Sequence, residues 1–150
     1  MRLVMYQPDI AQNLGACLRL AACFGLEMHV VEPCGFPLDD KRLRRSGMDY
    51  IDQVTLIRHS SWETFCTYRS EHAGRLLALT TKASAPHHQM TYVKDDYLLV
   101  GQESAGLPEH VHAMVDNRLI IPMREGMRSF NVAMSAAIVA AEAMRQLEWN

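Results

Sequence analysis

Polar side chains follow two apolar stretches in the last third of the chain, and their types could bind a ligand and move a proton. The loop of residues 101–108 directly follows one stretch, and Ser129 and Asn131 follow the other, at residues 120–123. Open α/β sheets bind ligands just outside the carboxyl ends of their strands. In the first loop, Glu103 could orient Arg19 or accept a proton through a water molecule, although a solvated loop glutamate is the alternative. The arrangement favours an enzyme over a packing scaffold.

A second candidate, Arg19, lies on a predicted helix just after the turn-forming segment 12–15. Its guanidinium could clamp a phosphate or orient a ribose. It could also serve as a base, but its very high pKa makes that role costly, so the identity of the base stays open. A solvated arginine on the helix surface is the alternative to all of these roles.

Apolar stretches alternate with helical patterns along the chain, and this predicts the elements that position these side chains. The alternation predicts an α/β fold with a parallel sheet and helices on both faces, in one domain over residues 1–150. Gly25 is expected to end the first helix, and Ser60 or Ser61 to begin the second. Strands are expected at residues 2–6, 28–31, 54–57, 76–79, 98–100 and 119–121, and helices at 13–24, 62–71, a short one with Pro108 in its first turn, and 131–147.

Composition and charge limit the classes of function. The formal net charge of −2 argues against a dedicated basic RNA-binding tail. Even so, the basic residues of segment 41–45 are numerous enough to hold a few phosphates. Neither a membrane-length apolar stretch nor a secretory signal is evident, which predicts a cytoplasmic protein. The four cysteines form no CxxC pair, and His110 and His112 lack a matching ligand cluster, so no metal is expected.

Three short segments resemble, in order, the motifs of the SPOUT methyltransferases, specifically the SpoU branch of RNA ribose 2′-O-methyltransferases. Two connecting segments, residues 32–45 and 79–82, resemble the short members of that branch that methylate the ribose of the tRNA wobble nucleotide. The resemblance covers nearly the whole chain, with departures at Leu14, often a small polar residue, and Gln102, often proline. The three segments are residues 13–15 with Arg19, residues 101–108 centred on Glu103 and Gly106, and residues 121–123 with 129–132.

This resemblance implies a parallel-sheet SPOUT fold with a C-terminal deep trefoil knot, and S-adenosyl-L-methionine as the cofactor. It implies the tRNA anticodon loop as the substrate, and a homodimer formed through the first and last helices, with neither membrane nor metal involved. The expected catalytic residues are Arg19, Glu103 and Asn131, with Asn131 either fixing one of the other two or only capping the last helix. The expected cofactor contacts are Leu79, Thr80, Gly101, Ile121, Met123 and Ser129, and the expected RNA contacts are Arg42, Arg45 and Arg128.

Two other functions stay open at this point. A ribosomal RNA ribose methyltransferase would use the same fold and the same mechanism on another substrate. A non-catalytic RNA-binding or nucleotide-binding module would keep the fold without turnover, although Arg19, Glu103, Ser129 and Asn131 are all in place for chemistry. A nicotinamide dehydrogenase is poorly supported, because no G-x-G-x-x-G follows the first predicted strand.

Overall fold

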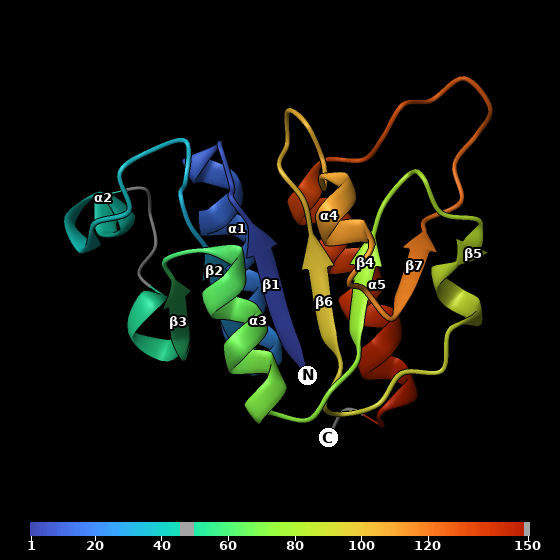
Figure 1. Ribbon diagram of the computed structural model, residues 1–150, viewed down its shortest axis with the longest axis horizontal. Coiled ribbons are helices and arrows are strands. Elements are labelled where there is room, and N and C mark those ends of the chain that lie inside the picture. Colours follow the sequence, from blue (N-terminus) through green and yellow to red (C-terminus); the bar gives the residue numbers. More distant parts are fainter. Residues whose placement is uncertain (46–49, 149–150) are drawn as a thin grey trace.

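The computed structural model describes residues 1–45 and 50–148, except for the side chains of Asp40, Arg42 and Arg45. Its strands are β1 (Arg2–Tyr6), β2 (Glu27–Val31), β3 (Leu56–His59), β4 (Leu76–Leu79), β5 (Ala85–Pro86), β6 (Tyr97–Val100) and β7 (Asn117–Ile120). They form a seven-stranded sheet in the order β3-β2-β1-β6-β4-β7-β5, and every neighbouring pair is parallel (Figure 1). The predicted parallel α/β fold is therefore confirmed.

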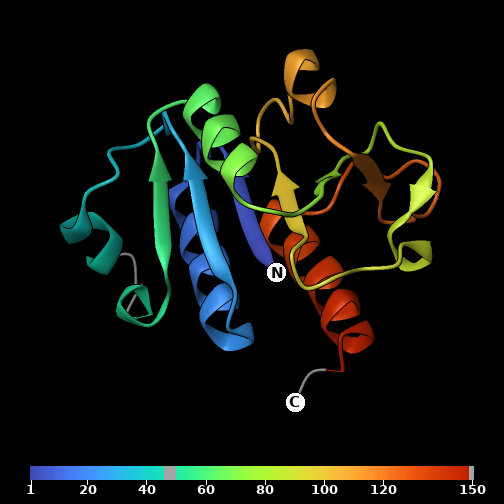
Figure 2. The ribbon, with the colours of Figure 1, turned by 60° about the horizontal axis from the view of Figure 1, so that its bottom comes forward.

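Helices cover both faces of this sheet, as the alternation predicts. The helices are α1 (Ala11–Phe24), α2 (Asp40–Arg45), α3 (Trp62–Glu71), α4 (Glu109–His112) and α5 (Val132–Gln146), with short 3₁₀ helices η1 (Ile51–Gln53) and η2 (His87–Gln89). Helices α1 and α5 lie on one face, whereas α3 and α4 lie on the other (Figure 2). Covering both faces explains why the central strands read as continuous apolar stretches.

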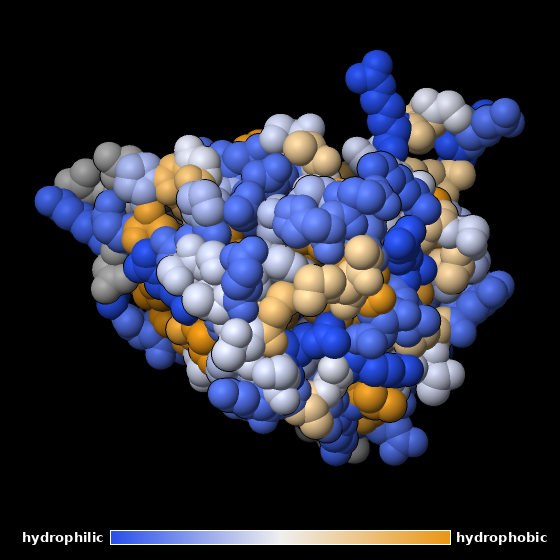
Figure 3. All heavy atoms as spheres, in the orientation of Figure 1, coloured by the Kyte–Doolittle hydropathy of each residue, from blue (hydrophilic) through white to orange (hydrophobic). Residues whose placement is uncertain are grey.

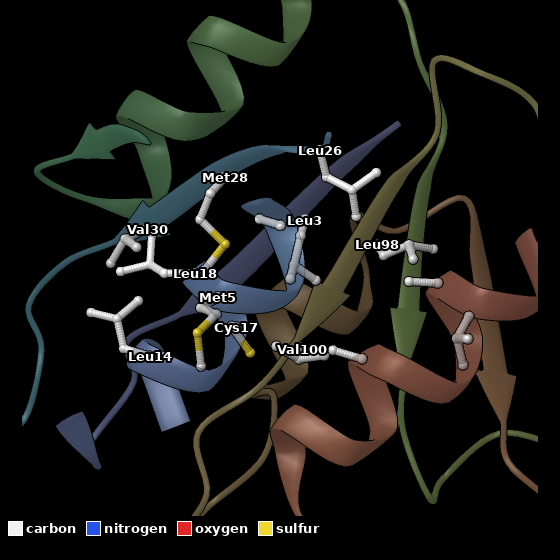
Figure 4. Packing of buried hydrophobic residues seen from close by; sticks show 14 of the residues in the cluster. Leu3, Met5, Leu14, Cys17, Leu18, Leu26, Met28, Val30, Leu98 and Val100 are labelled. Carbon is white, nitrogen blue, oxygen red and sulfur yellow. The ribbon is translucent and has the colours of Figure 1, made fainter. Parts of the chain in front are cut away.

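Alternate residues of each central strand serve the two halves of the core. Along β1, Leu3 and Met5 pack with Leu14 and Leu18 of α1, and their side chains meet between helix and sheet (Figure 4). The intervening residues of β1 face α3 and α4 instead. This period of two is what a strand geometry requires, and it fixes the register of the sheet.

The ends of the helices follow from local chemistry. Gly25 ends α1 with φ of 64°, a left-handed conformation that glycine adopts at no steric cost. Ser61 begins α3 with a capping box in which its hydroxyl accepts from the backbone N–H of Thr64. Asn131 begins α5, where its Oδ1 accepts from the N–H groups of Ala133 and Met134. All three caps were predicted.

Some predicted boundaries are wrong. The third strand was expected at residues 54–57 but spans Leu56–His59, because η1 precedes it and Val54 ends that 3₁₀ turn. Helix α2 and the two-residue strand β5 were missed, since each is too short to show a hydrophobic period. Pro108 precedes α4 as its N-cap rather than occupying its first turn.

The sheet has a topological switch point between β1 and β6, which are neighbours. The chain leaves β1 towards α1 on one face and leaves β6 towards α4 on the other. Loops that part in this way leave a crevice at the carboxyl ends of the strands. These loops gather at the top of Figure 1.

The face of the molecule drawn in Figure 3 is mainly hydrophilic, with apolar residues in scattered patches. Within residues 1–45 and 50–148, none of the helices combines the length and the apolar character that crossing a membrane requires.

Candidate active site

A cavity of about 460 Å³ opens beyond the carboxyl ends of β4, β6 and β7. It lies where the sequence places its polar loops, and its wall combines apolar side chains with the backbone of those loops. All six predicted cofactor contacts line it, namely Leu79, Thr80, Gly101, Ile121, Met123 and Ser129. Their contact with a cofactor stays a prediction, but the fold does bring residues from three separate segments into one wall.

The loop after β6 folds back on itself, and two glycines permit this. Gln102 and Gly106 form an antiparallel bridge, with hydrogen bonds of 3.1 and 2.9 Å between their backbones. A Cβ on Gly101 would lie 2.5 Å from the carbonyl carbon of Gly106, so only glycine fits there. Gly106 itself has a φ of 68°. The tight loop presents its backbone to the cavity.

A chain of hydrogen bonds joins the cavity loops to the start of α5. The Nδ2 of Asn131 donates to Oδ1 of Asn13 at 2.9 Å, and Nδ2 of Asn13 donates to Oε1 of Glu103 at 3.0 Å. All three side chains line the cavity. Asn131 therefore caps α5 and orients Asn13, which in turn holds Glu103, so the two predicted roles for Asn131 are not exclusive.

Asp9, in the turn after β1, holds the other side of Glu103. The backbone N–H of Asp9 donates to Oε2 of Glu103 at 3.0 Å, and the N–H of Glu103 donates back to Oδ1 of Asp9 at 3.1 Å. The hydroxyl of Ser104 also donates to the Asp9 carboxylate. Two carboxylates thus sit side by side at the switch point of the sheet.

The two carboxylates differ in their affinity for a proton. Burial, and then the neighbouring Asp9, raise the pKa of Glu103. Contacts with Glu103 and the Ser104 hydroxyl lower the pKa of Asp9 to about 2. Like charges at one site cannot both ionise freely, so the permanent charge rests on Asp9 and Glu103 is the group that takes up a proton.

Arg19 does not line the cavity of its own chain. It is exposed on α1, and its guanidinium carbon lies 5.1 Å from the centroid of the Tyr50 ring. The hydrogen bonds of Glu103 go to Asn13 and Asp9, so the idea that Glu103 orients Arg19 is not seen within one chain. A catalytic role for Arg19 stays a prediction.

Of the three predicted RNA contacts, the structure describes the side chain of Arg128 alone. Arg128 is exposed in the loop between β7 and α5 but does not line the cavity. The side chains of Arg42 and Arg45 lie outside the described residues. Lys82, which was not among the predicted contact residues, is the one lysine or arginine among the described residues of the cavity wall.

His112 forms part of the cavity wall on the side of α4 and is 2% exposed. Burial lowers the pKa of its ring, and neither ring nitrogen has a hydrogen-bond partner among the described residues. The ring is therefore neutral at pH 7. Among residues 1–45 and 50–148, no group of three or more His, Cys, Asp or Glu side chains is arranged to hold a metal ion.

Reasoning from the sequence missed Asp9 and gave Asn13 no role, although Asn13 was quoted within the first motif. Asn13 is only 8% exposed, an unusual degree of burial for an amide near a helix start. Asp9 comes three residues after a strand, at the same edge of the sheet as Glu103. That shared edge is the signal that could have found it.

Comparisons with known proteins agree with this geometry. The SpoU rRNA Methylase family matches residues 1–141. A relative from Beijerinckia indica, named tRNA (cytidine(34)-2′-O)-methyltransferase, is 54% identical over 145 residues, which cover 97% of this chain and 91% of the relative.

Two solved structures share the fold over nearly the whole chain. One, described as giving structural insights into the 2-OH methylation of C/U34 on tRNA, has a TM-score of 0.92 and 39% identity, and the match covers 99% of this chain and 97% of that one. The other is the SpoU methyltransferase AviRb from Streptomyces viridochromogenes in complex with the cofactor AdoMet. It has a TM-score of 0.89 and 21% identity, and the match covers all of this chain and 61% of that one.

The match to the family extends from β1 into α5 and so includes every loop of the cavity. The chain belongs to the SpoU rRNA Methylase family.

Proposed function

We propose that this protein transfers a methyl group from S-adenosyl-L-methionine to the ribose 2′-hydroxyl of the wobble nucleotide in a tRNA anticodon loop. The observation that carries the proposal is a cavity whose wall includes residues from all three motif segments, among them Asn13, Glu103 and Asn131. The names of the relative and of the more similar solved structure support the choice of tRNA and of the wobble position.

The cavity has properties that suit the cofactor. Its volume of about 460 Å³ falls within the range of small-molecule sites. Leu79, Leu107 and Ile121 offer apolar contact, while the glycine backbone at residue 101 permits close approach. The complex of AviRb with AdoMet shows that a protein of this fold accommodates such a ligand. When bound, S-adenosylmethionine supplies an electrophilic methyl group on its sulfonium.

The chain's own residues would remove the proton and position the nucleophile. A ribose hydroxyl is a poor nucleophile at neutral pH and needs a proton acceptor. Glu103 is the one carboxylate in the described part of the cavity wall. Its pKa is raised towards neutral pH, which suits a group that accepts a proton. In this proposal Glu103 accepts the hydroxyl proton, while Asn13 and Asn131 hold its carboxylate in a fixed orientation.

A homodimer through α1 and α5 would complete the site. These helices pack together on one face of the sheet. Near their N-terminal ends, Ile10, Phe130 and Met134 are 44%, 38% and 56% exposed, which is costly for apolar side chains in water. Burial of that surface against a second copy would bring Arg19 of one chain towards the other and form a wider grip on an RNA loop.

The same proposal includes one catalytic domain over residues 1–150 with the C-terminal trefoil knot of the SPOUT fold. The single seven-stranded sheet supports one domain. For the knot, the support is the match to the SpoU rRNA Methylase family over residues 1–141 and the fold shared with its solved structures.

The test is methyl transfer from labelled S-adenosylmethionine to total tRNA and, separately, to ribosomal RNA, with nucleoside analysis of the product. Wild type, Glu103→Gln and Arg19→Ala are compared with Glu71→Gln. This control, on α3, removes the same charge as Glu103→Gln. We expect a 2′-O-methylated wobble nucleotide with wild type and with Glu71→Gln, and little product with the other two.

Label found only in ribosomal RNA would leave the proposed mechanism in place but identify ribosomal RNA, rather than tRNA, as the substrate. Cofactor binding without transfer to any RNA would contradict an enzymatic function and support a binding module.

A further inference from the structure

We propose that Asp9 is a positioning residue for proton removal: its carboxylate fixes the loop that carries Glu103 and keeps Glu103 in a state that accepts the ribose hydroxyl proton. The inference deepens the proposed function and rests on it, since it assigns to Asp9 an action through Glu103. Asp9 does not line the cavity, so the role assigned to it is exerted through Glu103.

Asp9 holds the loop at two successive residues, Glu103 and Ser104. Its carboxylate accepts from the backbone N–H of Glu103 and from the hydroxyl of Ser104. Its own N–H donates to the Glu103 side chain. A carboxylate that accepts several hydrogen bonds is held in the ionised form. Asp9 therefore fixes both the backbone and the side chain of the proposed proton acceptor.

Asp9 is itself held in place by the segment after β2. The N–H of Gly35 donates to the carbonyl of Pro8 at 2.9 Å. A Cβ on Gly35 would lie 2.8 Å from the Cα of Asp9, so the two backbones are in close contact. Such packing leaves the turn little freedom to move away from the cavity loop.

The chain of hydrogen bonds from the start of α5 to Glu103 has a fixed direction of donation. The two N–H groups at the start of α5 occupy Oδ1 of Asn131, so its Nδ2 must point to Asn13. Asn13 then receives at Oδ1 and must donate from Nδ2 to Glu103. Because the start of α5 fixes the orientation of both amides, Oε1 of Glu103 must be a hydrogen-bond acceptor. The other oxygen, Oε2, is the one that accepts from the N–H of Asp9.

Three ionisable side chains, those of Asp9, Cys17 and Cys34, interact with Glu103. Asp9, in the turn after β1, is the charged neighbour that raises the pKa of Glu103 after burial. Cys17 of α1 and Cys34 of the segment after β2 also face Glu103, but burial raises the pKa of their thiols to about 12 and about 11, so both are neutral. The negative field at Glu103 therefore comes from Asp9, and it favours uptake of a proton by Glu103.

The direct test measures the titration of the Glu103 carboxyl carbon by ¹³C NMR in the full chain, with Glu103→Gln identifying the signal. In Asp9→Asn, which keeps the shape and removes the charge, the midpoint should fall by roughly one pH unit. In Ser104→Ala, which loosens the loop but keeps the charge, the midpoint should stay well above that of Asp9→Asn. A midpoint in Asp9→Asn equal to or above that of wild type would overturn the proposal.

A kinetic test follows the pH profile of methyl transfer. In Asp9→Asn the acid limb of kcat/KM should move to lower pH by the same amount, and kcat at its plateau should fall roughly tenfold. The charge control Glu71→Gln should leave both unchanged. A loss of rate with no movement of the acid limb would mean that Asp9 only supports the fold, which contradicts the proposal.

Two provisions keep the outcomes separate. If wild type transfers no methyl group, the proposed function fails, while the NMR titration still decides whether Asp9 controls Glu103. If Asp9→Asn does not fold, Asp9→Glu replaces it, since it keeps the charge and displaces the contacts by one methylene. A lower kcat in Asp9→Glu with the acid limb in place supports the proposal, and an unchanged kcat overturns it.

Discussion

The side-chain amide of Asn131 donates to Oδ1 of Asn13 at 2.9 Å and so joins the first turns of α1 and α5 across 118 positions of the sequence. The same Asn13 donates to Glu103 at 3.0 Å. One buried amide therefore connects the three motif segments of the chain, and it is the point at which a single substitution should disturb all of them.

Replacing this amide by Asn13→Ala should both destabilise the protein and slow methyl transfer. The change removes the hydrogen-bond partner of Nδ2 of Asn131 and of Oε1 of Glu103, and a typical intramolecular hydrogen bond contributes about 0.5–1.5 kcal/mol to stability. Thermal unfolding should show the lower stability, and kcat should fall because Glu103 loses its orientation. Gln12→Ala, at the exposed neighbouring position, should leave both close to wild type. Equal activity of Asn13→Ala and wild type would show that the amide is not needed to place Glu103.

The sequence was sufficient for the parallel sheet, the helix caps and the identity of the cavity loops, because these depend on local patterns. Continuous apolar stretches, the capping serine at residue 61 and the glycine at residue 25 each act within a few residues. The pairing of Asn13 with Asn131, and of Asp9 with Glu103, depends on which strand ends become neighbours. No local period contains that information.

Arg19 illustrates the opposite case. The motif pointed to a catalytic residue, but in one chain the side chain lies outside the cavity. In the proposed homodimer its location relative to a complete site would depend on a second subunit, and neither sequence periodicity nor the fold of one chain specifies the contact between two chains.

Gly101→Ala should weaken cofactor binding. The new Cβ would lie 2.5 Å from the carbonyl carbon of Gly106, so the loop must open and its bridge at Gln102 must break. We expect the Kd for S-adenosylhomocysteine, measured by calorimetry, to rise at least roughly tenfold, a loss of about 1.4 kcal/mol. Gly25→Ala is the matched control, because it has open space around it and lies at the far end of α1. It should lower the unfolding temperature without changing the Kd; an unaltered Kd in Gly101→Ala would refute the assigned role of the loop.

The buried pair His29 and His59 should make the protein acid-sensitive. Their rings are joined by a hydrogen bond of 2.8 Å, and His29 also contacts Glu27 at 2.7 Å. Burial lowers the pKa of both, that of His59 to about 4 with a further contribution from His29. Because the folded pKa lies below the unfolded value of about 6.5, the stabilisation is complete above that pH and is lost as pH falls towards 4.

The free energy of unfolding from urea titrations at pH 7.5 and pH 5 measures this effect. Wild type should lose on the order of 2 kcal/mol over this interval from His59, and His59→Phe, which keeps a ring among its aromatic neighbours, should lose less. Replacing the exposed His110 by Gln should not change the slope. A wild-type stability that is flat between the two pH values would contradict the assignment.

Arg19 and Glu103 should complement each other between subunits. They belong to different parts of one chain's surface: Glu103 lines the cavity, whereas Arg19 projects outside it and over Tyr50. On α1, Arg19 follows Asn13 by six positions, which at about 100° per residue places them on different sides of the helix. In a homodimer through α1 and α5, Arg19 would reach the partner's cavity rather than its own.

Mixing Arg19→Ala with Glu103→Gln and allowing the subunits to exchange tests this arrangement. In a mixed dimer, the cavity with intact Glu103 belongs to the Arg19→Ala chain and receives Arg19 from the other chain, so one of its two sites is complete. Since half of the dimers are then mixed, about a quarter of the wild-type rate should return, although each variant alone has little activity. A chain that carries both substitutions should show no recovery of activity when it is mixed only with itself, because none of its dimers has a complete site. A mixture that stays inactive while sedimentation shows mixed dimers would mean that Arg19 acts, if at all, within its own subunit.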